Sequence, residues 1–448
     1  MSYQIMMEPK LAQSYTAREL WTGETFFQVL ERQANRYPDR EALADAKSRI
    51  TYGGLKDKVE RCAEFFRRIG IKRGDVVTIQ LPNRIDFPIV FFALELIGAV
   101  ANKVNPDFRA RELEYILKFS NSSAYVCPKD FKNFDYVSMA KSLQQAVPKL
   151  THVIVAGGPA VGAHDLDNGL SECPPIAAAD RIKMDPNEIF RMAFTSGTTG
   201  DPKCVLHSFN TSLYASYLLN DDMKVTEKDV LLIWLPVGLN WGYMTLMQSV
   251  MAGARGVMME RFSARGALEL IQKERVSYIA TAPASIVAIL NEPLVGTFDT
   301  SSLRVIITGG ASATIETIKD YQARMSGHLI ELYGMLETGF HAYTRFTDDP
   351  QKVNGTIGRI VGAMELRIVD DAGNDVPYGE IGELCARGPS VRINSPRQKS
   401  ADPAGICRRE STRPSAERPP AETGLCRRLS PDSRDQPTGP PPAARDKA

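Results

Sequence analysis

Short apolar runs rich in β-branched residues alternate with longer stretches of helical periodicity from about residue 24 to residue 360. Leu55, Val59 and Phe66 fall at helical spacing, and residues 75–81 (DVVTIQL) then read as a buried strand. Strands that alternate with helices in this way form parallel sheets that are covered by helices on both faces. The sequence therefore predicts an α/β fold of stacked, mostly parallel sheets. Further predicted elements are helices over 87–99 and 111–119 and strands near 124–127, 276–280 and 303–308.

The pattern changes twice in the last quarter of the chain. Two alternating segments, 365–369 and 381–386, flank a turn sequence and predict a small antiparallel β subdomain. Beyond Asn394 the chain holds ten of its 28 prolines and no aromatic residue, so we expect a disordered tail. The change is abrupt; a native linker would explain it, but a shifted reading frame is our preferred interpretation. The predicted regions are 1–360, 361–393 and 394–448.

Composition excludes several classes of protein. The formal net charge is +1, which gives no overall attraction for nucleic acid or an anionic membrane. The N-terminus lacks the features of a signal peptide, and no stretch approaches the roughly 18 apolar residues that span a bilayer. The seven cysteines are scattered without a Cys-x-x-Cys pair, which favours reduced thiols over a zinc site or disulfide framework. We therefore expect a cytoplasmic protein.

Residues 195–203 (TSGTTGDPK) follow the apolar run 189–194 and are the most specific chemical signal in the sequence. Glycines let backbone N–H groups converge on one anion, hydroxyl side chains add donors, and a lysine adds positive charge. Such a cluster suits a polyphosphate, although a Gly/Ser/Thr-rich surface loop is the alternative. The residues expected to bind phosphate are Thr195, Ser196, Gly197, Thr198, Thr199, Gly200 and Lys203.

This segment is not a Walker P-loop, because the order G-x-x-x-x-G-K-[ST] is missing. It resembles the phosphate-binding loop of the adenylate-forming superfamily, which includes acyl- and aryl-CoA ligases, firefly luciferase and peptide-synthetase adenylation domains. The resemblance implies ATP and Mg²⁺ as cofactors and a catalytic role for Lys203. That family usually has Gly after the lysine, whereas this chain has Cys204, whose side chain we expect to stiffen or displace the loop.

A second segment, residues 331–337 (ELYGMLE), resembles the family's Y-G-x-T-E motif. The resemblance places Tyr333 near adenine and makes Glu337 a catalytic residue that helps to hold Mg²⁺. A hard cation that bridges phosphate oxygens needs a carboxylate, so the residue type fits. Leu336 replaces the usual threonine near the α-phosphate, as in aryl-acid-activating relatives. The alternative is the end of an amphipathic strand that carries an incidental acid.

Gly309, Gly310 and Ala311 follow the predicted strand at 303–308, and in the family this turn borders the adenine and acyl pockets. Glycine allows a backbone to approach a flat ligand closely, but alone the triplet would read as a plain strand-to-helix turn. The segment 382–388 resembles the family's G-E-L-x-x-R-G sequence, which we interpret as architectural.

Several segments narrow the resemblance, which covers roughly residues 20–393. WTGETF, QLPN, FDYVSMAK and YTRFTDDP look like those of 2,3-dihydroxybenzoate–AMP ligases and related aryl or alicyclic acid ligases. Residues 235–243 (LPVGLNWGY) match their substrate motif, which implies that Asn240 contacts the acid and Trp241 walls the acyl pocket. The alternative, that Asn240 caps a helix and Trp241 is a core residue, is equally compatible with the sequence.

Two features of the family are not found after Asn394: an aromatic-x-T-G-D motif and a C-terminal domain that supplies a catalytic lysine. We therefore expect this polypeptide to bind ATP weakly, to adenylate slowly or not at all and to form no thioester, since loss of one such charged group commonly costs about 10²–10³-fold in rate.

Several functions are compatible with these motifs. The predicted reaction is activation of an aryl, alicyclic or acyl carboxylic acid as its adenylate, with transfer to CoA. The alternatives are an aryl-acid–AMP ligase that loads a pantetheine carrier protein, and a truncated nucleotide- or acyl-binding relic. An unrelated α/β oxidoreductase is disfavoured, because no G-x-G-x-x-G follows an early strand.

Overall fold

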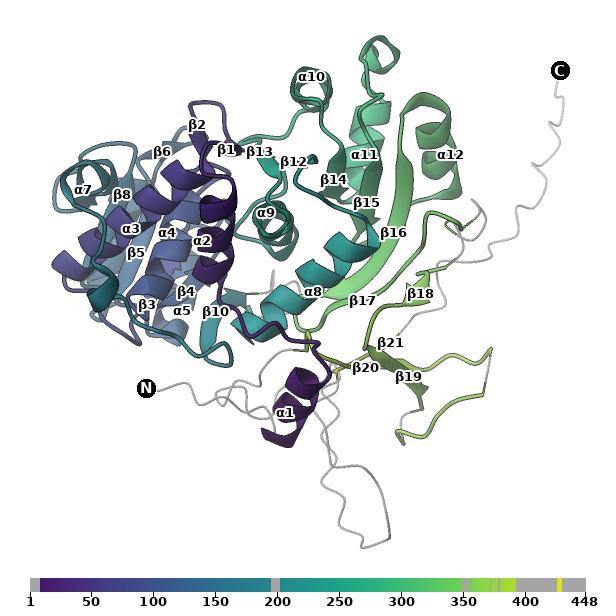
Figure 1. The fold of residues 1–448 in the computed structure, drawn as a ribbon, viewed down its shortest axis with the longest axis horizontal. Helices are drawn as coiled ribbons and strands as arrows, with labels where there is room; N and C mark the ends of the chain where they lie inside the picture. Colours follow the sequence, from purple (N-terminus) through teal and green to yellow (C-terminus); the bar gives the residue numbers. More distant parts are fainter. Residues whose placement is uncertain are drawn as a thin grey trace, which may run out of the picture.

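Two large β-sheets, with helices between them and on their outer faces, form the body of the molecule in the computed structural model (Figure 1). The structure describes residues 9–194, 202–348, 353, 356–370, 372–377, 379–391 and 425–428. The predicted α/β class of stacked, mostly parallel sheets is confirmed. Among the described residues, no helix combines the length and the apolar character needed to cross a bilayer.

The seven-stranded sheet is parallel except at one edge, where β11 runs antiparallel to β10. Its strands in spatial order are β11 (Cys204–Ser208), β10 (Ile189–Phe194), β4 (Val100–Lys103), β3 (Val76–Ile79), β5 (Ala124–Pro128), β8 (His152–Ala156) and β9 (His164–Asp165).

The nine-stranded sheet has a parallel centre and antiparallel strands at both edges. Its strands in spatial order are β18 (Arg359–Ile360), β17 (Gly339–Tyr343), β16 (His328–Met335), β15 (Val305–Gly309), β14 (Tyr278–Thr281), β12 (Val230–Ile233), β13 (Arg255–Met258), β1 (Glu41–Ala44) and β2 (Arg49–Thr51).

Helices cover both faces of these sheets, as the alternating pattern predicts. The described helices are α1 (Pro9–Ala17), α2 (Phe26–Arg36), α3 (Tyr52–Arg68), α4 (Asp86–Leu96), α5 (Ala110–Ser120), α6 (Tyr136–Ala146), α7 (Leu166–Glu172), α8 (Phe209–Asp222), α9 (Asn240–Ala252), α10 (Ala264–Glu274), α11 (Pro283–Leu290) and α12 (Ile315–Arg324), with 3₁₀ turns η1 (Ala178–Asp180) and η2 (Val295–Thr297). A two-stranded ribbon, β6 (Asp130–Phe131) with β7 (Phe134–Asp135), completes the body.

The largest hydrophobic core lies between the two sheets and joins them. Successive residues of a strand point to opposite faces, so Leu231 and Ile233 of β12 enter this inner core, whereas Leu232 enters a separate core beneath α10–α12. Helix α4 is apolar on all sides, and nearly every one of its residues is buried within the inner core. The inner core therefore fixes the seven-stranded sheet relative to the nine-stranded sheet.

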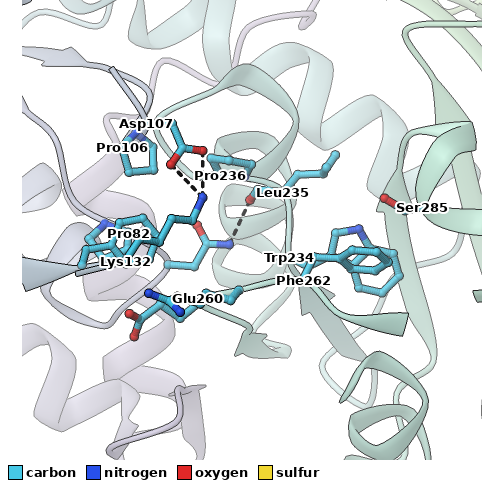
Figure 2. Close-up of a pocket in the computed structure, with 13 residues that line it drawn as sticks. Pro82, Pro106, Asp107, Lys132, Trp234, Leu235, Pro236, Glu260, Phe262 and Ser285 are labelled. Carbon is cyan, nitrogen blue, oxygen red and sulfur yellow. Dashed lines mark hydrogen bonds and ion pairs between the residues drawn. The ribbon is translucent and has the colours of Figure 1, made fainter. Parts of the chain in front are cut away.

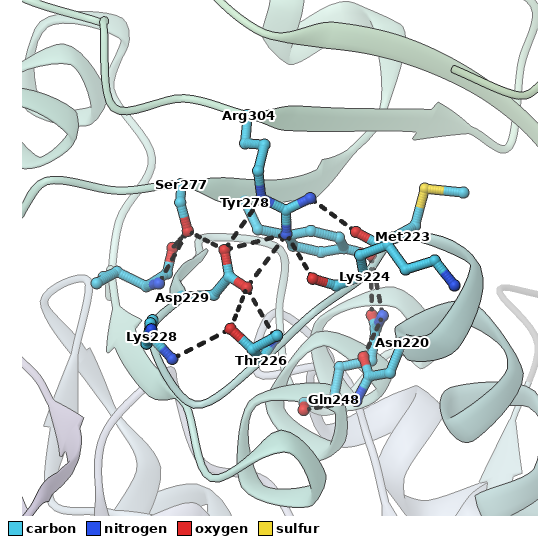
Figure 3. Close-up of polar contacts among 11 residues, drawn as sticks. Asn220, Met223, Lys224, Thr226, Lys228, Asp229, Gln248, Ser277, Tyr278 and Arg304 are labelled. Atoms are coloured by element: carbon cyan, nitrogen blue, oxygen red, sulfur yellow. Dashed lines mark hydrogen bonds and ion pairs between the residues drawn. The ribbon is translucent and has the colours of Figure 1, made fainter. Parts of the chain in front are cut away.

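A polar network joins the end of α8 to three central strands of the nine-stranded sheet (Figure 3). The buried carboxylate of Asp229 accepts hydrogen bonds from the Arg304 guanidinium at 3.0 and 3.1 Å and from Ser277 Oγ at 2.7 Å. Arg304 also donates to the carbonyl of Met223 at 2.7 Å. Because each buried polar group has a partner, the network stabilises this junction.

The small antiparallel unit predicted after residue 360 is present as a separate sheet. Strands β19 (Glu365–Val369) and β20 (Glu383–Arg387) pair antiparallel, and β21 (Leu425–Arg428) pairs with the other side of β20. The rest of the predicted tail 394–448 lies outside the described residues. Cys385 is disulfide-bonded, which corrects the prediction of reduced thiols throughout; Cys62, Cys127, Cys173 and Cys204 are free.

Candidate active site

The Gly-rich segment connects β10 to β11 at the edge of the seven-stranded sheet. In this antiparallel pair Phe194 lies opposite Cys204, so the apolar run 189–194 before the segment is a strand. Lys203 is partly buried and directly precedes β11. The side chain of Cys204 is buried in the outer core of this sheet, the separate hydrophobic core that packs α5 and α6 against the seven strands. The predicted phosphate-binding residues Thr195, Ser196, Gly197, Thr198, Thr199 and Gly200 lie outside the described residues.

The Y-G-x-T-E-like segment forms the end of β16 and the turn that leads to β17. Tyr333 is a strand residue whose ring centroid lies 5.4 Å from that of His341. Leu336 and Glu337 lie in the turn and are both partly exposed. Glu337 therefore lies in a turn at the end of a strand.

Two buried side chains hold this turn by its backbone. His207 of β11 donates from Nε2 to the carbonyl oxygen of Leu336 at 2.8 Å. Ser390 donates from Oγ to the carbonyl oxygen of Thr338 at 2.6 Å. The carbonyls on both sides of Glu337 are thus bonded, one of them to the strand that follows Lys203. Sequence reasoning missed His207; its only signal was a polar residue within the apolar run CVLHS.

The Gly309-Gly310-Ala311 triplet lies where β15 ends, beside the side chain of Trp241. A Cβ atom on Gly309 would come within 2.5 Å of the Leu332 carbonyl oxygen and 2.7 Å of the Trp241 ring, so only glycine fits. Gly310 has a φ of +85°, which glycine adopts readily. The triplet therefore allows the Trp241 ring to lie directly against the sheet edge.

A buried carboxyl group lies behind this triplet. Glu331 of β16 is 8% exposed and accepts a hydrogen bond from the backbone N–H of Ala313 at 3.0 Å. Burial raises the pKa of Glu331 to about 7, and the bond from Ala313 opposes this shift.

Asn240 and Trp241 begin α9, whose N-cap residue is Leu239. Asn240 is therefore the first helical residue and does not cap the helix, contrary to the alternative interpretation of the sequence. Its Oδ1 accepts a hydrogen bond from Nη1 of the buried Arg191 at 3.1 Å. Trp241 is partly buried against the inner core, with its ring centroid 5.7 Å from that of Phe340.

An aromatic cluster fixes the start of α9 relative to β10. Phe91 of α4 lies between Phe190 of β10 and Tyr243 of α9, with ring centroids 5.2 and 5.4 Å apart. Edge-to-face contacts of this kind favour one relative orientation of the rings. The structure thus brings Trp241, Gly309, Leu336 and the strand after Lys203 to one region between the two sheets.

A cavity of about 460 Å³ lies at the carboxyl ends of β3 and β12 (Figure 2). Asn83 anchors it by donating to the carbonyl oxygens of Ile233 and Leu235 at 3.1 and 3.0 Å and accepting from the Val237 N–H at 2.9 Å. None of the site residues predicted from sequence lines the cavity, although Leu235 and Pro236 of the substrate motif do. The cavity therefore lies at the beginning of the segment that leads to Asn240.

Comparisons with known proteins agree with these motifs. The profile of the family described as "AMP-binding enzyme" matches residues 30–392. The chain is 30% identical to a 2,3-dihydroxybenzoate-AMP ligase of Bacillus subtilis over 85% of its length and 70% of the relative's. It is 32% identical to a salicyl-AMP ligase / salicyl-S-ArCP synthetase of Mycobacterium tuberculosis, over 84% and 68% respectively. The apo structure of Mycobacterium smegmatis MbtA superposes with a TM-score of 0.80 at 28% identity, over 87% of this chain and 72% of that one.

Proposed function

The chain belongs to the AMP-binding enzyme family, as its motifs predict, and we propose that it is an acid–thiol ligase of the AMP-forming kind. It activates a carboxylic acid, of the aryl, alicyclic or acyl class, as the acyl-adenylate. One observation above all supports the proposal: the His207–Leu336 hydrogen bond joins the strand that follows Lys203 to the turn that carries Glu337. Two motifs 129 residues apart in sequence are thereby held together across two sheets.

The residues suit Mg²⁺ and ATP. Magnesium is usually bound through one or two carboxylates together with substrate phosphates, so the partly exposed Glu337 on its anchored turn is a suitable ligand. Within the described part of the chain no group of three or more acidic, histidine or cysteine side chains forms a metal cage. ATP, when bound, supplies the α-phosphorus that the carboxylate attacks, with release of pyrophosphate.

The side chains act by position and charge. Lys203 offers a cation to a phosphate oxygen, and Thr195, Ser196, Gly197, Thr198, Thr199 and Gly200 offer hydroxyl and backbone N–H donors. Trp241 offers a flat apolar wall for the acid, Asn240 orients it, and the Gly309-Gly310-Ala311 edge and Tyr333 border the adenine. A carboxylic acid is already ionised at neutral pH, so no general base is required; the work is orientation and neutralisation of charge.

The test is acid-dependent exchange of pyrophosphate into ATP, measured with a panel of aryl, alicyclic and aliphatic acids. Exchange with at least one acid is expected, and Glu337→Gln should lower its rate by about 10²-fold or more. Glu269→Gln, which removes a charge from the exposed face of α10, is the matched control and should leave the rate unchanged. ATP binding without exchange for any acid would instead favour the nucleotide-binding relic.

For the second half-reaction we propose CoA as the thiol acceptor, because the segment 195–203 resembles that of CoA ligases. The alternative is a pantetheine carrier protein, which the name of the mycobacterial relative favours. Mass spectrometry of reactions that contain CoA or a holo-carrier protein separates the two acceptors. The expected product is the CoA thioester; a thioester on the holo-carrier protein alone would favour the alternative acceptor.

A further inference from the structure

Two histidines lie side by side at one edge of the seven-stranded sheet, the edge opposite β11. His152 is the first residue of β8, and His164 is the first residue of β9, the last strand at this edge. The two strands are parallel, and His164 lies opposite Ile154. Because successive side chains of a strand point to opposite faces, His152 shares a face with Ile154 and hence with His164. The register therefore brings two of the chain's five histidines together.

The facing ring nitrogens of this histidine pair have the spacing of two ligands on one metal ion. His152 Nδ1 lies 3.4 Å from His164 Nε2, and the ring planes are inclined by 31°. Protein hydrogen bonds from N–H to oxygen are usually shorter, about 2.7–3.2 Å. Two nitrogens that each lie about 2.0–2.1 Å from a tetrahedral zinc ion are about 3.3–3.4 Å apart. The pair is thus already spaced for an ion and needs little rearrangement to bind one.

The surroundings of the histidine pair suit an ion that keeps part of its water. Both histidines are partly exposed. The ring of Phe65 from α3 lies 6.4 Å from that of His164 at an interplanar angle of 78°, so the inner core adjoins the pair on that side. In the part of the chain that the structure describes, no group of three or more histidine, cysteine or acidic side chains is placed to hold a metal. The pair therefore supplies two ligands, and water completes the coordination of the ion.

The imidazole of His164 is held in the form that binds metals. Burial and the neighbouring His152 both lower the pKa of His164. A metal-binding imidazole must be neutral, with one nitrogen free to ligate and a proton on the other. Because Nε2 of His164 faces the partner ring, Nδ1 carries the proton in the ligated form. The neutral form of His164 is thus favoured before any ion binds.

The other three histidines offer no comparable place. His207 and His341 are 2% and 0% exposed. His328 is exposed at the start of β16, and its ring lies 5.1 Å from that of Phe346. His328 is therefore a suitable control, since it is a histidine at the surface without a second imidazole as its ring contact.

We propose that His152 and His164 together bind one divalent transition-metal ion of the class that prefers imidazole ligands, for which Zn²⁺ is the probe. The ion joins the edge strand β9 to β8, and because it binds the folded chain it stabilises this edge of the sheet. The site is independent of the proposed function, because Mg²⁺ prefers oxygen ligands to imidazole.

The test measures Zn²⁺ binding to the full chain by isothermal titration calorimetry, with Mg²⁺ in excess to occupy sites made of oxygen ligands. Saturable binding of one Zn²⁺ per chain is expected. Loss of a group beyond the ligands commonly costs about 10–100-fold in metal affinity, so His152→Gln and His164→Gln should each weaken binding at least about tenfold. His328→Gln should leave the affinity unchanged. No binding, or equal binding by the wild type and both pair variants, would overturn the inference and leave a hydrogen bond alone between the rings.

Co²⁺ in place of Zn²⁺ identifies the ligand atoms. Its absorption spectrum should lack a thiolate-to-metal charge-transfer band, since the proposed ligands are imidazole nitrogen and water oxygen. Zn²⁺ should also slow amide hydrogen exchange in residues 153–166 of the wild type and in neither pair variant. A thiolate band that persists in both variants would place the ion on cysteines and overturn the inference. Should one pair variant not fold, the other variant and the Co²⁺ spectrum decide the question.

Discussion

The carboxyl group of Glu331 is buried, and its charged form is therefore poorly solvated. Its pKa of about 7, raised by burial from a usual value of 4.5, means that the folded protein binds this proton more tightly than the unfolded chain does. Stability should therefore fall as pH rises from about 4.5 to about 7, and the cost stays constant above that range. Glu331→Gln keeps a hydrogen-bond acceptor for the Ala313 N–H but removes the charge.

We expect Glu331→Gln to unfold with a free energy up to about 3 kcal/mol higher than the wild type at pH 8.5, and with little difference at pH 4.5. Urea titrations at the two pH values measure this. The exposed Glu269→Gln should show no such pH dependence. A stabilisation of equal size at both pH values would mean that burial does not control the proton of Glu331.

Cys204 stands where the family usually has glycine. It is a residue of β11, and its side chain is buried in the outer core of the seven-stranded sheet. Cys204→Gly should lower the free energy of unfolding by about 1–2 kcal/mol, because buried contacts are lost and the unfolded chain gains freedom. Cys204→Ala should cost less, since only the sulfur is removed. Thermal or urea unfolding measures both; an unchanged stability would contradict the packing described.

At the scale of elements, helices and strands are predictable where periodicity alone determines them. Helix α3 and strands β3 and β5 lie at their predicted places, because each has a strong apolar pattern. The strand predicted at 276–280 begins two residues late, at Tyr278. The reason is that the N–H of Val276 bonds to Ile271 and completes the end of α10. The pairing of β10 with β11 was not predicted, because an antiparallel partner at a sheet edge is chosen by tertiary contacts.

The link between β11 and the β16–β17 turn provides a test at this scale. His207→Leu removes the donor to the Leu336 carbonyl and leaves that acceptor unpaired, which should cost about 1–3 kcal/mol of stability. It should also weaken the Mg²⁺ dependence of ATP binding, because the turn that carries Glu337 loses one anchor. His207→Gln retains an N–H donor and should recover part of both effects. If the Leu and Gln variants show equal Mg²⁺ dependence, the bond does not position Glu337.

At the scale of the whole molecule, the small β-sheet is joined to the body by specific contacts. The buried Trp21 donates from Nε1 to the Pro389 carbonyl at 3.1 Å, and Tyr214 Oη accepts from the Ala363 N–H at 3.0 Å. Trp21→Ala should lower the free energy of unfolding by about 3–5 kcal/mol. It should also raise amide hydrogen exchange in residues 361–391 more than in the central strands. Uniform changes in exchange would contradict a local joining role.

The motif residues of the candidate site could be predicted from the sequence, but the residues that surround them in the fold could not. Motif residues such as Lys203, Glu337 and Trp241 follow from short sequence patterns, because their chemistry is local. Arg191, His207 and Lys103 follow from none, since each is a polar residue inside a strand and its neighbours come from distant parts of the chain. Long-range packing therefore determines what local patterns cannot.

The hydrogen bond from His207 to Leu336 also has a consequence for biosynthesis. Its partners are 129 residues apart, so the turn that carries Glu337 cannot be anchored until the ribosome has released both strands of the β16–β17 pair. A nascent chain that has emerged only as far as β15 contains the Gly-rich segment without that turn. Because closure of such distant contacts is slow, competence to bind nucleotide should arise late, after most of the polypeptide has been made.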